Sequence, residues 1–186
     1  MDKAELRKIV KARAAALDGG YIAESDAGIL RNLVSLPEFI AARRVFTYIS
    51  TGNEPDTRAL IALCARSGKT VAVPAAHPGG KMAFAPLDRP PEALEAGAFG
   101  IPAPPSGLRA LSPKADDLML VPALCFDETA FRLGRGGGYY DRYLAASPVF
   151  SVGLCRERLV IQAVPRDAWD RPVACLVTEK RIARPE

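Results

Sequence analysis

The stretch from Leu118 to Tyr143 reads LMLVPALCFDETAFRLGRGGGYYDRY. Its apolar start, Leu118 to Val121, predicts a buried strand, and the residues from Tyr139 onward predict an amphipathic helix. Between them lie four glycines in five positions, at 134, 136, 137 and 138. A strand, a glycine-rich turn and a helix in this order are typical of an α/β protein.

The glycine segment, residues 134 to 138, predicts a phosphate site. Glycine loses more backbone freedom on folding than any other residue, so such a cluster indicates that bare backbone is needed close to something. Backbone N–H groups at the start of a helix favour an anion, and Arg132 and Arg135 add positive charge with a fork geometry. Asp141, one turn later, could hold Mg²⁺ bridging such phosphates. A flexible surface hairpin remains the alternative interpretation.

Two familiar nucleotide-binding motifs are excluded. The glycine segment is not a dinucleotide fingerprint, because Tyr139 stands where the last glycine would be needed for helix packing. Ser67-Gly-Lys-Thr is not a P-loop, because Leu63 stands where glycine is required. In addition, Gly68 follows a predicted helix and precedes a predicted strand, the reverse of the P-loop order, and is expected to end that helix.

Composition predicts one globular domain, residues 1–186. The chain is 49% hydrophobic and 25% charged, with a net charge of +4. That charge is too mild for a nucleic-acid-binding protein but suits an anionic small substrate. The four cysteines lack C-x-x-C spacing and lie in apolar surroundings, so buried free thiols are expected rather than zinc or disulfides: Cys64, Cys125, Cys155 and Cys175. With no signal segment or membrane span apparent, a cytoplasmic protein without membrane or nucleic-acid partners is expected.

Hydrophobic periodicity predicts alternating helices and strands. Helices are expected from Asp2 to Leu17 (with Leu6, Ile9, Val10 and Leu17 inward), Ser25 to Leu36, Thr57 to Ser67 and Tyr139 to Ala145. Strands are expected at Arg44 to Ser50, Thr70 to Pro74, Lys81 to Pro86 (an edge strand), Leu118 to Val121, Val149 to Leu154 and Ala174 to Thr178. The alternation predicts a single three-layer α/β/α domain with a mostly parallel central sheet. The proline-rich stretch from Leu87 to Pro113 predicts a long ordered loop covering the site.

A few charged residues outside the glycine segment invite a functional interpretation. Glu54 lies in a strand-to-helix turn, where the carboxyl end of a parallel strand would place it near a ligand, although an exposed turn glutamate fits as well. Lys3 and Arg7 share a helix face, which on its own indicates a solvated surface. His77, the only histidine, lies in a turn-rich segment and is expected at the surface.

Taken together, these residues resemble the 5-formyltetrahydrofolate cyclo-ligase family, also called methenyltetrahydrofolate synthetases. The resemblance rests on Val121-Pro122, Phe126-Asp127 and the run from Arg132 to Arg142. It is supported by Lys3 and Arg7, Ser50 to Thr57, Gly100 to Pro104, Val164-Pro165 and Trp169-Asp170, so that it spans essentially the whole chain. Ala130 and Ala103 depart from the family pattern, which usually has glycine at the first position and often an acidic or amide residue at the second.

The resemblance implies an ATP- and Mg²⁺-dependent conversion of 5-formyltetrahydrofolate to 5,10-methenyltetrahydrofolate, in which the formyl oxygen is phosphorylated by ATP and N10 then displaces phosphate. It implies catalytic roles for Arg132, Arg135 and Tyr140, and Mg²⁺ ligation by Asp141 and Asp170. Folate contacts are implied for Ile49, Glu54, Arg135 and Tyr139. ATP contacts are implied for Lys3, Arg7, Arg132, Leu133, Gly134, Arg135, Gly136, Gly137, Gly138, Tyr139 and Tyr140.

Two other functions stay open at this point, a non-catalytic nucleotide- or folate-binding paralogue and a kinase of another small metabolite. Lys3, Glu54, Arg132 and Asp141 together argue against a pure binder, which has no need of both metal and phosphate groups. Either a monomer or a weak homodimer is expected.

Overall fold

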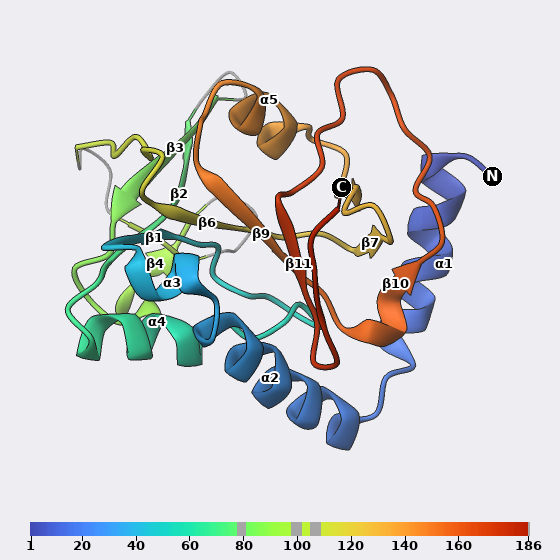
Figure 1. Cartoon of the computed structure of the whole chain (residues 1–186), viewed down its shortest axis with the longest axis horizontal. Helices are drawn as coiled ribbons and strands as arrows, with labels where there is room; N and C mark the ends of the chain where they lie inside the picture. Colours follow the sequence, from blue (N-terminus) through green and yellow to red (C-terminus); the bar gives the residue numbers. More distant parts are fainter. Residues whose placement is uncertain (78–80, 98–101, 105–108, 186) are drawn as a thin grey trace.

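The computed structural model describes residues 1–77, 81–97, 102–104 and 109–185, and its centre is one large β-sheet (Figure 1). Within these residues the sheet has seven strands in the order β12-β11-β9-β6-β1-β2-β3. Their bounds are β1 (Arg44–Phe46), β2 (Thr70–His77), β3 (Lys81–Pro86), β6 (Leu118–Val121), β9 (Phe150–Leu154), β11 (Cys175–Val177) and β12 (Ile182–Ala183).

The five inner strands run parallel, and only the two edges are antiparallel. The pairs β11–β9, β9–β6, β6–β1 and β1–β2 are parallel, whereas β3 and β12 pair antiparallel with β2 and β11. The α/β class with a mostly parallel sheet is thus confirmed, as is the expectation that residues 81–86 form an edge strand. Parallel strands end at one edge, so the turns after β1, β6 and β9 converge there.

The first strand is shorter than predicted, and the reason is local. β1 ends at Phe46, although the residues up to Ser50 remain buried. The backbone N–H of Ser50 donates to Thr57 Oγ1 at 2.9 Å, and that hydroxyl donates to the carbonyl of Tyr48 at 2.8 Å. A threonine side chain, rather than a neighbouring strand, therefore pairs with this backbone and bends it toward the helix that follows.

Three helices cover one face of the sheet: α2 (Gly19–Val34), α3 (Pro37–Ala41) and α4 (Arg58–Arg66) (Figure 1). Their apolar side chains pack with alternate residues of the strands, among them Val45, Leu120 and Val152. The predicted start of the second helix at Ser25 is wrong, because Asp18 caps it by accepting the backbone N–H of Tyr21 at 2.8 Å. The Gly19-Gly20 pair masks this earlier start, since glycine is a poor helix former.

The opposite face is covered by one short helix and a second, smaller sheet. The helix α5 (Tyr139–Ala145) contributes Tyr140, Tyr143 and Leu144 to this side of the core. The small sheet has the order β10-β7-β8 and consists of β7 (Cys125–Asp127), β8 (Arg132–Leu133) and β10 (Val160–Ile161). These two- and three-residue strands are too short to give a periodic signal, and the sequence pattern did not predict them.

The N-terminal helix α1 (Lys3–Ala15) packs against the small sheet. Asp2 caps it by accepting the backbone N–H groups of Ala4 and Glu5, both at 2.8 Å. Leu6 and Val10 are buried against Cys125 and Leu133. The predicted burial of Ile9 is wrong. Leu6 and Val10, four positions apart, face inward, whereas Ile9 lies beside them on the helix surface and is exposed.

The described parts of the segment between β3 and β6 are mostly irregular, as predicted. Its described parts include η1 (Pro91–Ala93) and the paired strands β4 (Glu95–Ala96) and β5 (Pro102–Ala103). Gly100 and Ile101, part of the predicted motif, lie outside the described residues. His77 ends strand β2 instead of lying in a turn, and its side chain, predicted at the surface, is outside the described part of the structure.

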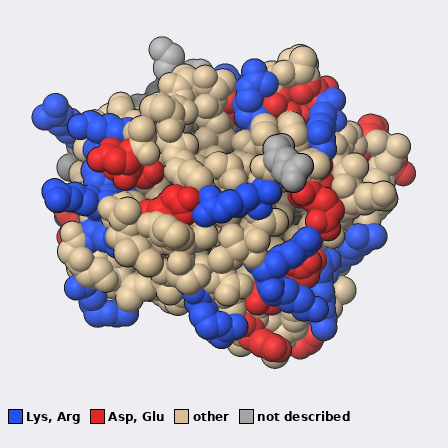
Figure 2. Space-filling model, viewed as in Figure 1, with Lys and Arg blue, Asp and Glu red and all other residues tan. Residues whose placement is uncertain are grey.

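Charges of both signs are interspersed on the face shown in Figure 2. In the described part of the chain many charged side chains form ion pairs, such as Arg184 with Glu38 and Arg181 with Glu128. No helix in the described part of the chain is long and apolar enough to cross a bilayer.

All four cysteines are free and buried. Burial raises the pKa of the Cys64 thiol to about 11 and that of Cys125 to about 12. It also raises the pKa values of Cys155 and Cys175. The reactive thiolate is therefore scarce at neutral pH.

The native protein should react slowly with a thiol-specific reagent at pH 8, because a thiol of pKa about 11 is ionised in roughly one molecule per thousand at that pH. All four thiols should react promptly once the chain is unfolded in guanidinium. The absorbance of the released reagent gives the number of thiols that have reacted in the native and in the unfolded protein. A thiol that reacts within seconds in the native protein, or stoichiometric zinc by elemental analysis, would contradict the structural role.

Candidate active site

A cavity lies at the carboxyl ends of the central strands. It has a volume of about 540 Å³. The turns after β1 and β6 both line this cavity. The two strands are neighbours in the sheet, but the chain continues from β1 to β2 on one side and from β6 to β9 on the other. Open α/β sheets bind ligands at such a point, where the strand order reverses. Its walls comprise Tyr48, Ile49, Glu54, Pro74, Met82, Pro102, Ala103, Pro122, Ala123, Arg132, Gly134, Arg135, Gly136, Gly137, Gly138, Tyr139, Tyr140 and Asp141.

The glycine segment forms one wall of this cavity and has the backbone that only glycine adopts readily. Gly136 has φ +109° and Gly138 has φ +62°, both in the region that side chains disfavour. Gly138 is also the residue preceding α5. Arg7 supports the segment from α1, because its Nε donates to the carbonyl of Gly134 at 2.9 Å.

Arg132 and Asp141 form an ion pair at the base of the glycine segment. Arg132 Nη2 donates to Asp141 Oδ1 at 2.6 Å, and Nη1 donates to the carbonyl of Arg171 at 2.6 Å. Burial lowers the pKa of Arg132, while the Asp141 carboxylate opposes that shift. Asp141 Oδ2 accepts no hydrogen bond from any residue that the structure describes.

Glu54 and Arg135 form a second ion pair across the cavity mouth. Arg135 Nη2 donates to Glu54 Oε1 at 2.7 Å, and Glu54 Oε2 accepts the backbone N–H of Thr51 at 2.8 Å and its hydroxyl at 3.1 Å. Arg135 is 60% exposed. The Glu54 side chain is only 14% exposed, so water screens the pair mainly from the arginine side, from which a ligand can reach it.

Lys3 and Asp170 are paired with each other outside the cavity. Lys3 Nζ donates to Asp167 at 2.6 Å and to Asp170 at 2.5 Å. Burial alone would lower the pKa of Lys3, but these two hydrogen bonds outweigh it and raise the pKa. Burial would raise the pKa of Asp170, but the Lys3 ammonium and the backbone N–H of Asp167 lower it. The charge of Asp170, like that of Asp141, opposes the lowering of the pKa of Arg132 by burial.

Two tyrosines of α5 line the cavity in different ways. Tyr139 is 39% exposed, and the guanidinium of Arg142 lies 5.4 Å from its ring centroid. The hydroxyl of Tyr140 is buried and has no hydrogen-bond partner among the described residues. Burial, and after it the Glu54 carboxylate, raises the pKa of Tyr140, so this hydroxyl stays neutral and can donate to a ligand.

Arg156, which follows β9, fixes the turn that carries Glu54. Its side chain is 1% exposed and pairs with Asp26 of α2 at 2.8 Å. It also donates to the carbonyls of Asn53 at 3.4 Å and Glu54 at 3.3 Å, and to the hydroxyl of Ser25. One buried guanidinium thus joins α2, the Glu54 turn and the end of β9.

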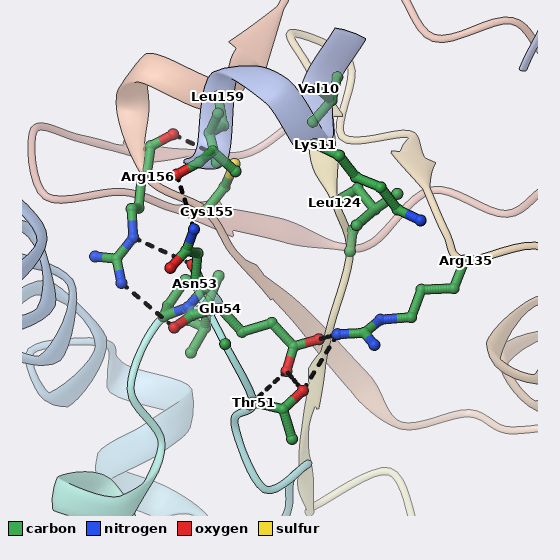
Figure 3. Close-up of a pocket in the computed structure, with 15 residues that line it drawn as sticks. Val10, Lys11, Thr51, Asn53, Glu54, Leu124, Arg135, Cys155, Arg156 and Leu159 are labelled. Atoms are coloured by element: carbon green, nitrogen blue, oxygen red, sulfur yellow. Dashed lines mark hydrogen bonds and ion pairs between the residues drawn. The ribbon is translucent and has the colours of Figure 1, made fainter. Parts of the chain in front are cut away.

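A second cavity of about 340 Å³ adjoins the first (Figure 3). Glu54, Ala123 and Arg135 line both, so their ion pair separates the two spaces. The remaining walls come from α1, the turn after β1, the segment between β6 and β7, and the end of β9 with the residues that follow it. They comprise Val10, Lys11, Ala14, Thr51, Gly52, Asn53, Pro55, Leu124, Leu154, Cys155, Arg156 and Leu159.

The structure gathers most, but not all, of the residues predicted from the sequence. Around the larger cavity lie Ile49, Glu54, Arg132, Arg135, Tyr139, Tyr140, Asp141 and the four glycines. Lys3, Arg7, Leu133 and Asp170 do not line it: Arg7 reaches the glycine segment from behind, and Leu133 is buried in the small core beside α1. The sequence analysis did not assign Tyr48 and Arg156 to the site, and it named Pro122 only as part of the family resemblance. Each lies at the carboxyl end of a parallel strand, the same signal that indicated Glu54.

The two departures from the family pattern have different settings. Ala130 is buried and has φ +59°, the only non-glycine residue with positive φ in the described part of the chain. Glycine would adopt this backbone without strain, which accounts for the family preference; an alanine in this region costs about 1 kcal/mol. Ala103 lines the larger cavity, so its small side chain leaves that wall apolar.

The described residues contain no cluster of three or more acidic, histidine or cysteine side chains that could hold a metal. Mg²⁺ does not require one, because it usually takes one or two carboxylates, water and the oxygens of a bound phosphate. The unpartnered Oδ2 of Asp141, in the cavity wall, suits one such position.

These features define an α/β protein with a ligand site at the carboxyl ends of its parallel strands, one wall of which is glycine backbone flanked by arginines. The chain belongs to the 5-formyltetrahydrofolate cyclo-ligase family, whose model matches residues 1–179.

Named relatives and a solved structure agree with this membership. A 5-formyltetrahydrofolate cyclo-ligase of Mycolicibacterium smegmatis is 32% identical over 86% of this chain and 85% of its own. The enzyme of that name from Escherichia coli is 30% identical over 81% of this chain and 85% of its own. The NMR structure of Aquifex aeolicus 5,10-methenyltetrahydrofolate synthetase superposes with a TM-score of 0.83 at 34% identity, covering 99% of this chain and 93% of the other.

Replacing Arg156 by alanine should lower the free energy of unfolding by about 3 kcal/mol, the lower end of the range for breaking a buried ion pair, because Asp26 keeps some solvent contact. Arg158→Ala is the matched control, since Arg158 is exposed, lies 3.6 Å from Asp18 and has its guanidinium 3.9 Å from the ring centroid of Tyr21. It should change stability by about 1 kcal/mol or less, the range for exposed ion pairs and cation–π contacts. Urea unfolding followed by circular dichroism measures both, and equal losses would contradict the role given to Arg156.

Proposed function

We propose that this chain converts 5-formyltetrahydrofolate to 5,10-methenyltetrahydrofolate, with ATP turned over to ADP and phosphate. The observation that carries the proposal is the shared cavity: the glycine segment and the Glu54 turn open into one space of about 540 Å³. Family membership supplies the reaction, and the cavity brings a phosphate-type wall and a carboxylate within reach of one another.

The glycine segment and Arg132 form the nucleotide side in this proposal. The backbone N–H groups of residues 134 to 138 bind phosphate oxygens, with Tyr139, Tyr140 and the guanidinium of Arg135 beside them. Arg7 holds the segment in place through Gly134. Lys3 reaches the phosphates by leaving Asp167 and Asp170, and Leu133 anchors the strand before the segment.

Ile49, Glu54, Arg135 and Tyr139 form the folate side. Glu54 is presented by a turn that Thr51 and Arg156 fix, so it is positioned before substrate binds. Its carboxylate orients the pterin and N10 region. Arg135 can contact either substrate, since it lines the space between Glu54 and the glycine segment.

The reaction needs no nucleophile from the protein. The formyl oxygen attacks the γ-phosphorus as the bond to ADP breaks, and N10 then attacks the formyl carbon as phosphate leaves. The chain must therefore hold the reacting atoms in line and stabilise the charge that develops on phosphate oxygens. Arg132, Arg135 and the neutral hydroxyl of Tyr140 serve that purpose.

Mg²⁺ would be held by Asp141 and, once Lys3 has moved away, by Asp170, and would screen the charge of the phosphates. A reducing compartment, the cytoplasm, is also part of the proposal and suits four buried free thiols. The proposed oligomeric state is a monomer or a weak homodimer.

Purified protein given 5-formyltetrahydrofolate, ATP and Mg²⁺ should produce a growing methenyl-folate absorbance and one ADP per product. Omission of ATP should abolish the signal. ADP formation without the methenyl band would point to a kinase of another metabolite, and folate binding without either product would point to a non-catalytic paralogue. Either result would overturn the proposal.

Glu54→Gln and Asp141→Asn should impair different substrates. Glu54→Gln should reduce turnover on the order of 10²–10³-fold and weaken folate binding while ATP affinity stays close to that of the unmodified chain. Asp141→Asn should lower activity in a way that added Mg²⁺ partly restores, because weakening one oxygen ligand shifts metal affinity. The measurement is kcat and KM for both substrates at several Mg²⁺ concentrations.

Glu128→Gln is the matched control for these variants, because Glu128 is exposed and pairs with Arg181 away from both cavities. Its activity should be unchanged. If Glu54→Gln acted mainly on ATP, or Asp141→Asn were fully active at low Mg²⁺, the residue assignments would be wrong even with the reaction correct.

A further inference from the structure

We propose that the second cavity binds the aminobenzoyl-glutamate half of the folate substrate, with Lys11 pairing with a glutamate carboxylate. The inference rests on the proposed function and adds a subsite to it. The reaction needs ATP and folate bound together, whereas about 540 Å³ lies in the ordinary range for a single ligand, ~300–1000 Å³. Part of one substrate must extend elsewhere, and the cavity of about 340 Å³ is the adjoining space.

In this proposal the boundary between the two cavities falls where the two halves of the folate substrate join. N10, which closes the new ring, connects the pterin half of folate to the aminobenzoyl half. Glu54 and Arg135 line both cavities and lie between them. With the formyl group and N10 beside the glycine segment, the aminobenzoyl ring continues past this ion pair into the second cavity. The guanidinium of Arg135 is exposed, so it can turn toward water and open this passage.

The second cavity has the chemistry of that half of the substrate. Val10, Leu124 and Leu159 supply apolar walls for a ring. Asn53 Nδ2 donates to the carbonyl of Ala14 at 2.8 Å. This bond orients the side-chain amide of Asn53. Its Oδ1 has no partner in the described part of the chain, so it can accept a hydrogen bond from the N–H of the benzoyl–glutamate amide.

Lys11 supplies the charge that the glutamate end requires. It lines the second cavity, is exposed, and forms no ion pair or hydrogen bond with any residue that the structure describes. Figure 3 shows Lys11 and Arg135 on one side of the cavity, with Arg156 on the other. Arg156 is already paired with Asp26. Among the cationic side chains that line this cavity in the described part of the chain, Lys11 is the one without a partner, so it is assigned to the anionic tail. Further glutamates would add to the attraction at low salt.

Lys11→Gln tests this directly, with Lys8→Gln as the matched control that removes the same charge from α1 outside both cavities. For 5-formyltetrahydrofolate, Lys11→Gln should raise KM about two- to fivefold, the upper half of the range for an exposed ion pair, with kcat and the KM for ATP unchanged. The increase in KM should be larger for the triglutamate form of 5-formyltetrahydrofolate. It should vanish for an analogue in which a neutral methylamide replaces the glutamate.

Ala14→Leu gives a second, independent test by filling the cavity from α1. It should raise the KM for all three folates severalfold, whereas Ala12→Leu, on the exposed side of the helix, should not. The inference is overturned if Lys11→Gln leaves the KM for folate as low as Lys8→Gln does, or if it raises the KM for the methylamide analogue as much as that for the natural substrate. It is also overturned if Lys11→Gln raises the KM for ATP, or if Ala14→Leu leaves the KM for folate unchanged. Failure of the unmodified chain to form methenyl product would instead overturn the proposed function, and this inference with it.

Discussion

The site depends on the buried guanidinium of Arg156. A turn of irregular backbone carries Glu54 away from β1, and its own hydrogen bonds, from Thr51 to Glu54 Oε2, do not tie it to the rest of the molecule. Arg156 binds two carbonyls of this turn and is itself held by Ser25 and Asp26. The position of Glu54 is therefore set by a helix on one face of the sheet and by a strand end, both of which belong to the core.

A second constraint is that the charges around the site are paired with one another before any ligand arrives. Arg132 is bound to Asp141, Arg135 to Glu54, and Lys3 to Asp170. These pairs lower the cost of holding like charges close together. They also mean that substrate binding exchanges one set of ion pairs for another, so its net electrostatic gain is smaller than the number of cations near the cavity implies.

Local patterns in the sequence predicted the parts of the structure that depend on local physics. The buried strand at Leu118 to Val121 was identified because a short apolar run between turn residues is typical of a strand covered on both faces. The glycine segment was identified because clustered glycines indicate backbone that must come close to another group. Glu54 was placed correctly after β1, since the carboxyl ends of parallel strands meet at one edge.

What could not be predicted depends on residues far apart in the sequence. Lys3 meets Asp170 across 167 positions, and Arg156 meets Asn53 across 103, with no periodic signal linking either pair. The strands of the small sheet are too short to produce a pattern. The early start of α2 was hidden by two glycines whose helix propensity is low, although Asp18 supplies a strong cap.

The docking of α1 has a consequence for the order in which the molecule assembles. Lys3 and Arg7 of α1 contact Asp167, Asp170 and Gly134, which follow them by 127 to 167 positions. During synthesis these contacts form only after the residues near Asp170 have emerged, and closing so long a loop costs conformational entropy. The glycine wall of the larger cavity therefore gains its support from Arg7 only once most of the chain has been made.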